Sequence, residues 1–349
     1  YLNMFNGCKN LTEAPVLPAT TLAADCYSMM FYNCSSLEKA PALPATTMAA
    51  RCYSNMFFGC KSLIEAPALP ATTLARECYI QIFAGCSKIK TPPVLPAQTL
   101  AYGCYRSMFM DCSSLTEAPE LPVTTLEDYC YYGLFWNCSS LKKAPELPAT
   151  VMAKECYTIM FGGCSSLTEA PKLPSTTLAD YCYSSMFSDC INLKATPELP
   201  ATTLAYGCYN SMFSRCTNLV KVSKLPATEM TDYCYSGMFA GCTSLSVAPE
   251  LPAKTLAKGC YFTMFQNCTA LTTAPVLPAV TLANRCYMFM FSNCTNLNSV
   301  AMLATDVSAD LCLDLWLDRV STTGVFYKNS SVTDYSAYGI PEGWEVKDY

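Results

Sequence analysis

Residues Cys34 to Gly59 read C-S-S-L-E-K-A-P-A-L-P-A-T-T-M-A-A-R-C-Y-S-N-M-F-F-G, and variants of these 26 residues recur along most of the chain. One column of cysteines runs from Cys8 to Cys294 and a second from Cys26 to Cys312, both at intervals of 26 residues. We call each repeat a coil and count its positions from the first cysteine, +0. Self-similarity at such a fixed period predicts a solenoid, in which each coil buries its apolar side chains against its neighbours.

The composition is typical of one elongated and well-packed domain. Of the 349 residues, 52% are hydrophobic and 14% charged, so disorder is not expected. The net charge of −5 offers no basic surface for phosphates or anionic lipids, and we expect no nucleic-acid partner. The apolar runs are too short to span a bilayer, so we expect no membrane insertion of this segment. Because the chain begins within a coil, we expect that an N-terminal signal is missing from it.

The second half of each coil has the spacing of a short helix. Leu22, Cys26 and Met30 follow one another at four-residue steps, and Tyr27 and Phe31 form a second stripe beside them. This pattern predicts about ten to twelve helical residues in each coil. A threonine pair precedes the segment and suits an N-cap, and the Gly, Asn or Asp before the next cysteine suits a left-handed stop.

The first half of each coil is extended and marked by prolines. Leucine stands at +3 in eleven of twelve coils and at +9 in all twelve, so these positions predict core columns. Proline stands at +7 in ten coils and at +10 in eleven. Because proline has no N–H, a continuous ladder cannot run through these columns. We therefore expect only three or four strand residues in each coil, around Leu37 to Ala40.

These halves predict an α/β fold, a curved solenoid of the leucine-rich-repeat type with about twelve coils, each a short strand plus a short helix. Strands stack about 5 Å apart and helices about 8 to 10 Å apart, which would place the strands on the inside of the curve. The pattern changes after Cys312, and Val325–Tyr327 and Trp344–Val346 are predicted strands of a small β cap. We therefore expect a solenoid over residues 1–312 and a capping segment over residues 313–349.

The 24 cysteines are interpreted as stacked buried thiols. Cys26 and Cys34 would lie about 12 Å apart along the predicted helix, beyond the ~7 Å limit for a disulfide. Pairing between neighbouring coils within the Cys34 column stays open as an alternative. The chain has no histidine and no C-x₂-C pair, so neither a metal, a cofactor nor Ser-His-Asp or Cys-His catalysis is expected. We expect no enzyme activity.

Recognition by a solenoid uses the positions that vary from coil to coil, because the constant positions form the core. The candidate binding residues are aromatic side chains at variable positions of the predicted helix: Tyr102, Tyr129, Tyr132, Trp136, Tyr181, Tyr206 and Tyr233. Exposed tyrosine and tryptophan favour a protein or glycan partner. The alternative is that these rings only cover gaps between neighbouring coils. A second variable set consists of strand-side charges, among them Glu13, Glu38, Lys39, Glu65, Glu117, Lys142 and Lys143.

The stretch Met56 to Leu63, M-F-F-G-C-K-S-L, resembles the A-F-x-G-C-x-S-L core of BspA-like leucine-rich repeats, and the resemblance covers about residues 1–312. The chain departs from that pattern in its 26-residue period, its Cys-Tyr pair and its A-P-x-L-P segment. The resemblance implies an extracellular or cell-surface protein of anaerobic gut or oral bacteria, secreted or anchored to the outer membrane. Some relatives act as adhesins for host extracellular-matrix proteins or other bacteria, and the family has no catalytic motif.

The leading hypothesis is a non-catalytic, monomeric cell-surface repeat protein that binds a protein or glycan on a host or bacterial surface. One alternative is a structural spacer without a ligand of its own. Another is glycan binding through the exposed aromatic columns.

Overall fold

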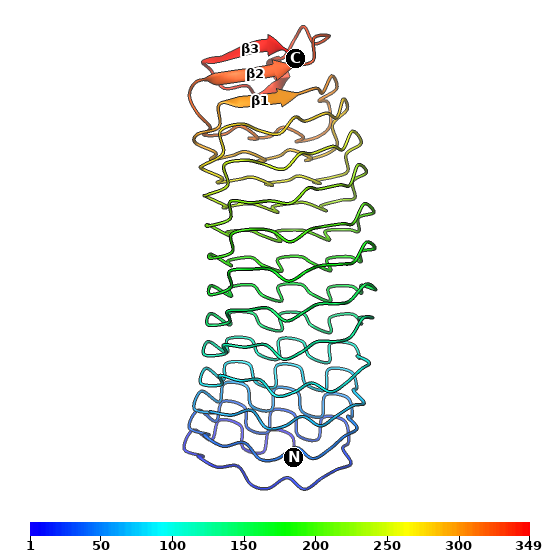
Figure 1. Ribbon diagram of the computed structural model, residues 1–349, viewed down its shortest axis with the longest axis vertical. Coiled ribbons are helices and arrows are strands. Elements are labelled where there is room, and N and C mark those ends of the chain that lie inside the picture. Colours follow the sequence, from blue (N-terminus) through cyan, green and yellow to red (C-terminus); the bar gives the residue numbers. More distant parts are fainter. The chain divides into compact units, whose positions relative to one another are not determined.

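The computed structural model describes residues 1–349, which form two compact units, residues 1–172 and residues 173–349. Each unit is a stack of coils in which a residue lies beside its equivalent 26 positions away (Figure 1). The predicted repeat architecture is therefore confirmed. We call positions +16 to +25 of each coil the turn segment and positions +3 to +13 the strand segment.

The prediction of a helix in each coil is wrong. The only helical element is a single 3₁₀ turn, η1 (Ser336–Tyr338). The turn segment is a run of consecutive β-turns, and Asp25, Met29 and Asn33 have φ angles of 57°, 54° and 57°. An α-helix of L-residues excludes left-handed residues at every fourth position, whereas a type II turn requires positive φ at its third residue. The threonine pair therefore caps no helix, but the left-handed residue before each cysteine is present as predicted.

Backbone hydrogen bonds in the turn segment alternate between two directions. Even-numbered residues donate within the coil, as Cys26 N–H does to the carbonyl oxygen of Ala23 (N···O 3.3 Å). Odd-numbered residues donate to the next coil, as Tyr27 N–H does to the carbonyl oxygen of Cys52 (2.9 Å). The same alternation runs through both units. It pairs the buried backbone polar groups that folding would otherwise leave without partners.

Two ladders of aromatic rings fill the core beneath the turns. Phe31 and Phe57 stack with ring centroids 5.6 Å apart and planes 3° from parallel, and Tyr27 and Tyr53 stack at 5.9 Å and 7°. The second unit contains both columns as well, with Tyr235–Tyr261 at 6.0 Å, for example. Each such pair contributes about 0.5–1.5 kcal/mol beyond the burial of its area. The stacking requires neighbouring coils to keep the same register.

The strand segment forms only isolated bridges where prolines are present. Glu13, Lys39 and Glu65 are joined by parallel bridges at position +5, ahead of the proline columns. In the twelfth coil alanine replaces both prolines, and there the chain forms β1 (Ser299–Met302). Proline therefore limits the strands, as predicted. Because the helices are absent, the predicted difference between helix spacing and strand spacing, from which we expected a curve, does not exist.

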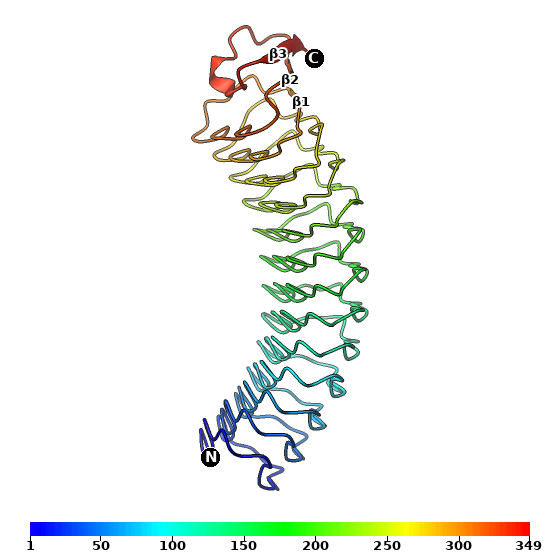
Figure 2. The ribbon, with the colours of Figure 1, turned by 90° about the vertical axis from the view of Figure 1, so that its left-hand side faces the viewer.

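The C-terminal residues cover the last coil of the second unit with a three-stranded parallel sheet. β2 (Gly324–Lys328) pairs with β1 and β3 (Trp344–Asp348) pairs with β2, so both predicted cap strands are confirmed (Figures 1 and 2). The indole N–H of Trp316 donates to the carbonyl oxygen of Tyr338 (2.7 Å). The Tyr338 hydroxyl donates in turn to the carbonyl oxygen of Ala304 (2.7 Å). These bonds fasten the segment around η1 onto the last coil.

The hydroxyls of Tyr79 and Tyr235 are buried without a hydrogen-bond partner. We predict that Tyr79→Phe and Tyr235→Phe each raise the free energy of unfolding by about 1 kcal/mol, because they remove a buried unsatisfied group and keep the ring. Denaturant titration measures the change, with Tyr105→Phe as a control expected to change little. A loss of stability of 1 kcal/mol or more in both variants would show that these hydroxyls are satisfied.

Candidate functional site

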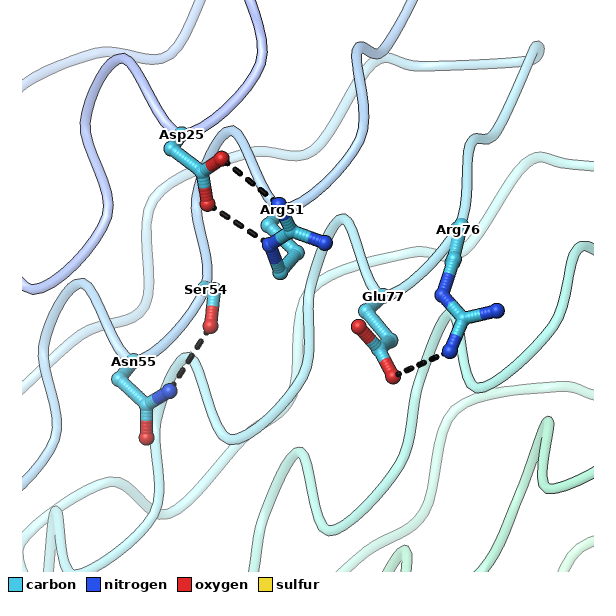
Figure 3. A network of polar contacts seen from close by, with 6 residues as sticks. All are labelled: Asp25, Arg51, Ser54, Asn55, Arg76 and Glu77. Carbon is cyan, nitrogen blue, oxygen red and sulfur yellow. Dashed lines mark hydrogen bonds and ion pairs between the residues drawn. The ribbon is translucent and has the colours of Figure 1, made fainter.

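The outward side chains of the turn segment interact with the equivalent position of the next coil. Arg51 donates two hydrogen bonds to Asp25, from Nε to Oδ1 (2.8 Å) and from Nη2 to Oδ2 (2.9 Å), both at position +17 (Figure 3). This hydrogen bonding lowers the pKa of Asp25. Arg76 and Glu77 form a weaker pair (3.5 Å) one coil further on. The surface is therefore built from contacts between successive coils.

In the first unit the structure brings three of the predicted tyrosines together. Tyr129 contacts Tyr102 and Tyr132, with ring centroids 5.3 Å and 6.1 Å apart. The guanidinium of Arg76 lies 4.1 Å above the centroid of Tyr102. That of Arg106 lies 4.7 Å from the centroid of Tyr132 and 5.4 Å from that of Tyr129. We call these five residues the Tyr129 cluster, in which the protein's own cations occupy the ring faces.

A carboxylate completes the Tyr129 cluster. The Tyr129 hydroxyl donates to Oε1 of Glu155 (2.8 Å). This hydrogen bond, together with desolvation, raises the pKa of Tyr129 to about 12. Trp136 is half-buried and has no ring contact with the three tyrosines. The sequence pattern gave no sign that Arg76 and Arg106 lie on the tyrosine rings.

In the second unit Tyr206 lies between two other predicted tyrosines. Its ring meets that of Tyr181 at 5.1 Å and 74°, and that of Tyr233 at 5.9 Å and 65°. We call these three residues the Tyr206 cluster. A Cβ atom added to Gly207 would lie 2.5 Å from Cε1 of Tyr181, and one added to Gly259 would lie 2.5 Å from Cε1 of Tyr233. In the second unit, glycine at the same position of the next coil therefore makes room for the rings of Tyr181 and Tyr233.

The rings of both clusters are partly buried, mainly by side chains of neighbouring coils. Tyr206 is the most open, with 39% of its surface exposed, and the other six candidate residues are half-buried. The alternative that the rings cover gaps between coils thus describes part of their role. The exposed remainder is a rigid surface, because each ring is held by a neighbouring ring, cation or glycine.

The thiols are part of the core. No disulfide joins the 24 cysteines, and 22 of them are buried. In the Cys34 column each thiol reaches back to the preceding coil, as Cys60 Sγ does to the carbonyl oxygen of Phe31 (3.1 Å). Burial raises the pKa of Cys52 and of Cys60 to about 12. A reactive cysteine needs a lowered pKa and access to solvent, and these buried thiols have neither.

The strand-side charges border shallow grooves in the first unit. One groove of about 630 Å³ is lined by Glu117, Lys142 and Lys143 over a floor that includes Pro119 and Pro145. A second, of about 680 Å³, is lined by Glu13, Glu38, Lys39 and Glu65 among others. Charges of both signs lie along these grooves. They form no cluster of acid, base and nucleophile.

No group of three or more His, Cys, Asp or Glu side chains is arranged to hold a metal ion. The structure also contains no helical segment with the length and hydrophobicity needed to cross a bilayer.

Comparison with known families identifies the repeat. The profile described as BspA type Leucine rich repeat region (6 copies) matches residues 2–116, 82–219, 131–272 and 209–308. The chain belongs to the BspA-type leucine-rich repeat family. Membership confirms the family suggested by the M-F-x-G-C-x-S-L core and indicates a surface protein of a generally non-catalytic family. No curated protein and no solved structure matches the chain.

The buried thiols predict an alkaline limit to stability of this BspA-type array. Their pKa in the folded chain lies above the ordinary value of 9.0, so the unfolded chain releases protons that the folded chain retains. The contribution of these thiols to the free energy of unfolding should therefore be fully present below about pH 8. It should fall from about pH 9 towards pH 12, by up to about 1.4 kcal/mol per pH unit for each such thiol. Urea titrations across this range measure it. A free energy of unfolding that stays constant up to pH 11 would contradict the buried thiol columns.

The fit between Tyr233 and Gly259 gives a second prediction. Gly259→Ala should destabilise the protein by about 1–3 kcal/mol, because the new methyl group overlaps the Tyr233 ring. Gly103→Ala is the matched control, since Gly103 has the same φ of 56° but faces only the flexible Glu77 side chain at 3.3 Å. Thermal unfolding of both variants isolates the ring contact. Equal losses would mean that Tyr233 does not rest on Gly259.

Proposed function

We propose that this chain is a non-catalytic module, displayed outside the bacterial cell, that binds a macromolecule of a host or of another bacterium through the turn segments. Family membership supports the surface location. The observation that supports the binding role is the pair of partly exposed aromatic clusters on the turn segments. Catalysis has no support in the arrangement of side chains, because 22 of the 24 thiols are buried and the carboxylates are dispersed.

The side chains of the Tyr129 cluster favour a protein partner. Tyrosine and arginine are enriched among the residues that dominate binding energy at protein interfaces, where rigid rings lose little entropy on binding. A sugar ring would need an open aromatic face, but Arg76 and Arg106 already lie over the faces of this cluster. Glycan binding through the aromatic columns is therefore the weaker proposal for the first unit. The strand-side grooves, with charges of both signs, would contribute secondary contacts.

Binding to immobilised host extracellular-matrix proteins and to intact bacterial cells tests the proposal. Two variants separate the clusters: Tyr102→Ser with Tyr132→Ser in the first unit, and Tyr206→Ser in the second. Each lost anchor should weaken binding about tenfold for the cluster that the partner uses. Tyr335→Ser is the control, because Tyr335 is a tyrosine of the same exposure (40%) in the cap.

Circular dichroism of each variant checks that the array is intact. Binding that is equal in wild type and all variants would exclude the aromatic clusters. The absence of binding to every surface in the panel would favour the structural spacer instead.

A further inference from the structure

The two aromatic clusters are built on equivalent positions of the repeat. Tyr102 and Tyr206 both occupy +16, and Tyr129 and Tyr233 both occupy +17 of the following coil. The local sequences also agree, with Y-G-C at residues 102–104 and 206–208 and D-Y-C at residues 128–130 and 232–234. Equivalent backbone positions should place equivalent rings in the same way, so the clusters can be compared directly.

The clusters differ in their cations. Arg76, which lies over Tyr102, is replaced by Asp180 at the equivalent position of the second unit. Arg106, which lies over Tyr129 and Tyr132, is replaced by Asn210. No arginine or lysine side chain lies over the ring of Tyr206, and Lys258 only approaches Tyr233 at 5.9 Å. The second cluster therefore has the counterparts of Tyr102 and Tyr129 without the guanidinium groups, and Ser236 stands at the position of Tyr132.

Exposure and charge both favour a cation at the vacant position. Tyr206 has 39% of its surface exposed, whereas Tyr102, which Arg76 covers, is less exposed. Asp180 accepts the backbone N–H of Tyr206 through Oδ1 (3.1 Å), and Asp232 accepts that of Lys258 through Oδ1 (3.0 Å). Each carboxylate keeps Oδ2 without a protein partner. Two carboxylates beside open tyrosine rings attract a cation and repel an anion.

We propose that the Tyr206 cluster is the docking site for an arginine side chain of a basic segment in a partner protein. The partner's guanidinium takes the place over Tyr206 that Arg76 holds over Tyr102, and its N–H groups donate to the free oxygen of Asp180. Arginine fits better than lysine, because its planar group can stack on the ring and donate in plane to a carboxylate at the same time. This inference rests on the proposed function and names the chemistry of the partner.

A dye-labelled Gly-Arg-Gly-Arg-Gly peptide is the probe, used with the whole chain at low ionic strength. The same peptide with citrulline in place of arginine is the neutral control. We expect the arginine peptide to bind at least about fivefold more tightly, since the neutral citrulline loses both the cation–π contact with the ring and the ion pair with Asp180. Asp180→Arg, which rebuilds the arrangement of the first unit, should weaken binding about tenfold. Glu342→Arg makes the same charge change at an exposed position of the cap and should weaken it less than twofold.

The reciprocal variant Arg76→Asp removes the guanidinium group that lies over Tyr102 in the first unit. It should add a second site, so that the peptide stoichiometry rises from one to two; melting temperatures confirm that both variants are folded. Equal binding of the citrulline peptide, or unchanged binding to Asp180→Arg, would overturn the proposal. If a macromolecule from the binding panel is not displaced by the arginine peptide, the docking chemistry is wrong while the binding function stands. If the peptide binds but no macromolecule does, the proposed function fails instead.

Discussion

The structure depends on the alternation of backbone hydrogen bonds in the turn segment, where each odd-numbered N–H bonds to the next coil and each even-numbered N–H bonds within its own. Every coil has 26 residues, so every position keeps its role from coil to coil. Insertion of one residue within a turn segment would exchange the two roles in the rest of that segment and shift its aromatic rings out of register with the neighbouring coils. This constraint accounts for twelve coils without an insertion or deletion.

The same constraint determines what the surface can vary. The left-handed residue at +17 directs its side chain onto the next coil. The +17 residues of neighbouring coils must therefore fit each other, as Asp25 fits Arg51 and Tyr233 fits Gly259. The pairs differ along the chain while the backbone does not. The side chains on the surface can therefore be aromatic in some coils and charged in others, while the backbone fold stays the same.

The sequence predicted the repeat and the core columns, because both follow from strict periodicity, and it predicted the cap strands where that pattern changes. It did not predict the turns. Two turns advance the chain by four residues, so Cys26 and Met30 fall at the i, i+4 spacing of a helix although the backbone is not helical. Contacts such as Arg106 with Tyr132 depend on side-chain direction, which spacing alone does not give.

Far-UV circular dichroism of the purified chain is the most direct test of the central claim, that stacked turns and not helices form the second half of each coil. We expect a spectrum without the double minimum of an α-helix, because only three residues, Ser336–Tyr338, are helical and those are 3₁₀. A strong double minimum, with the intensity expected if about two fifths of the residues were helical, as about ten helical residues in every coil would give, would contradict it.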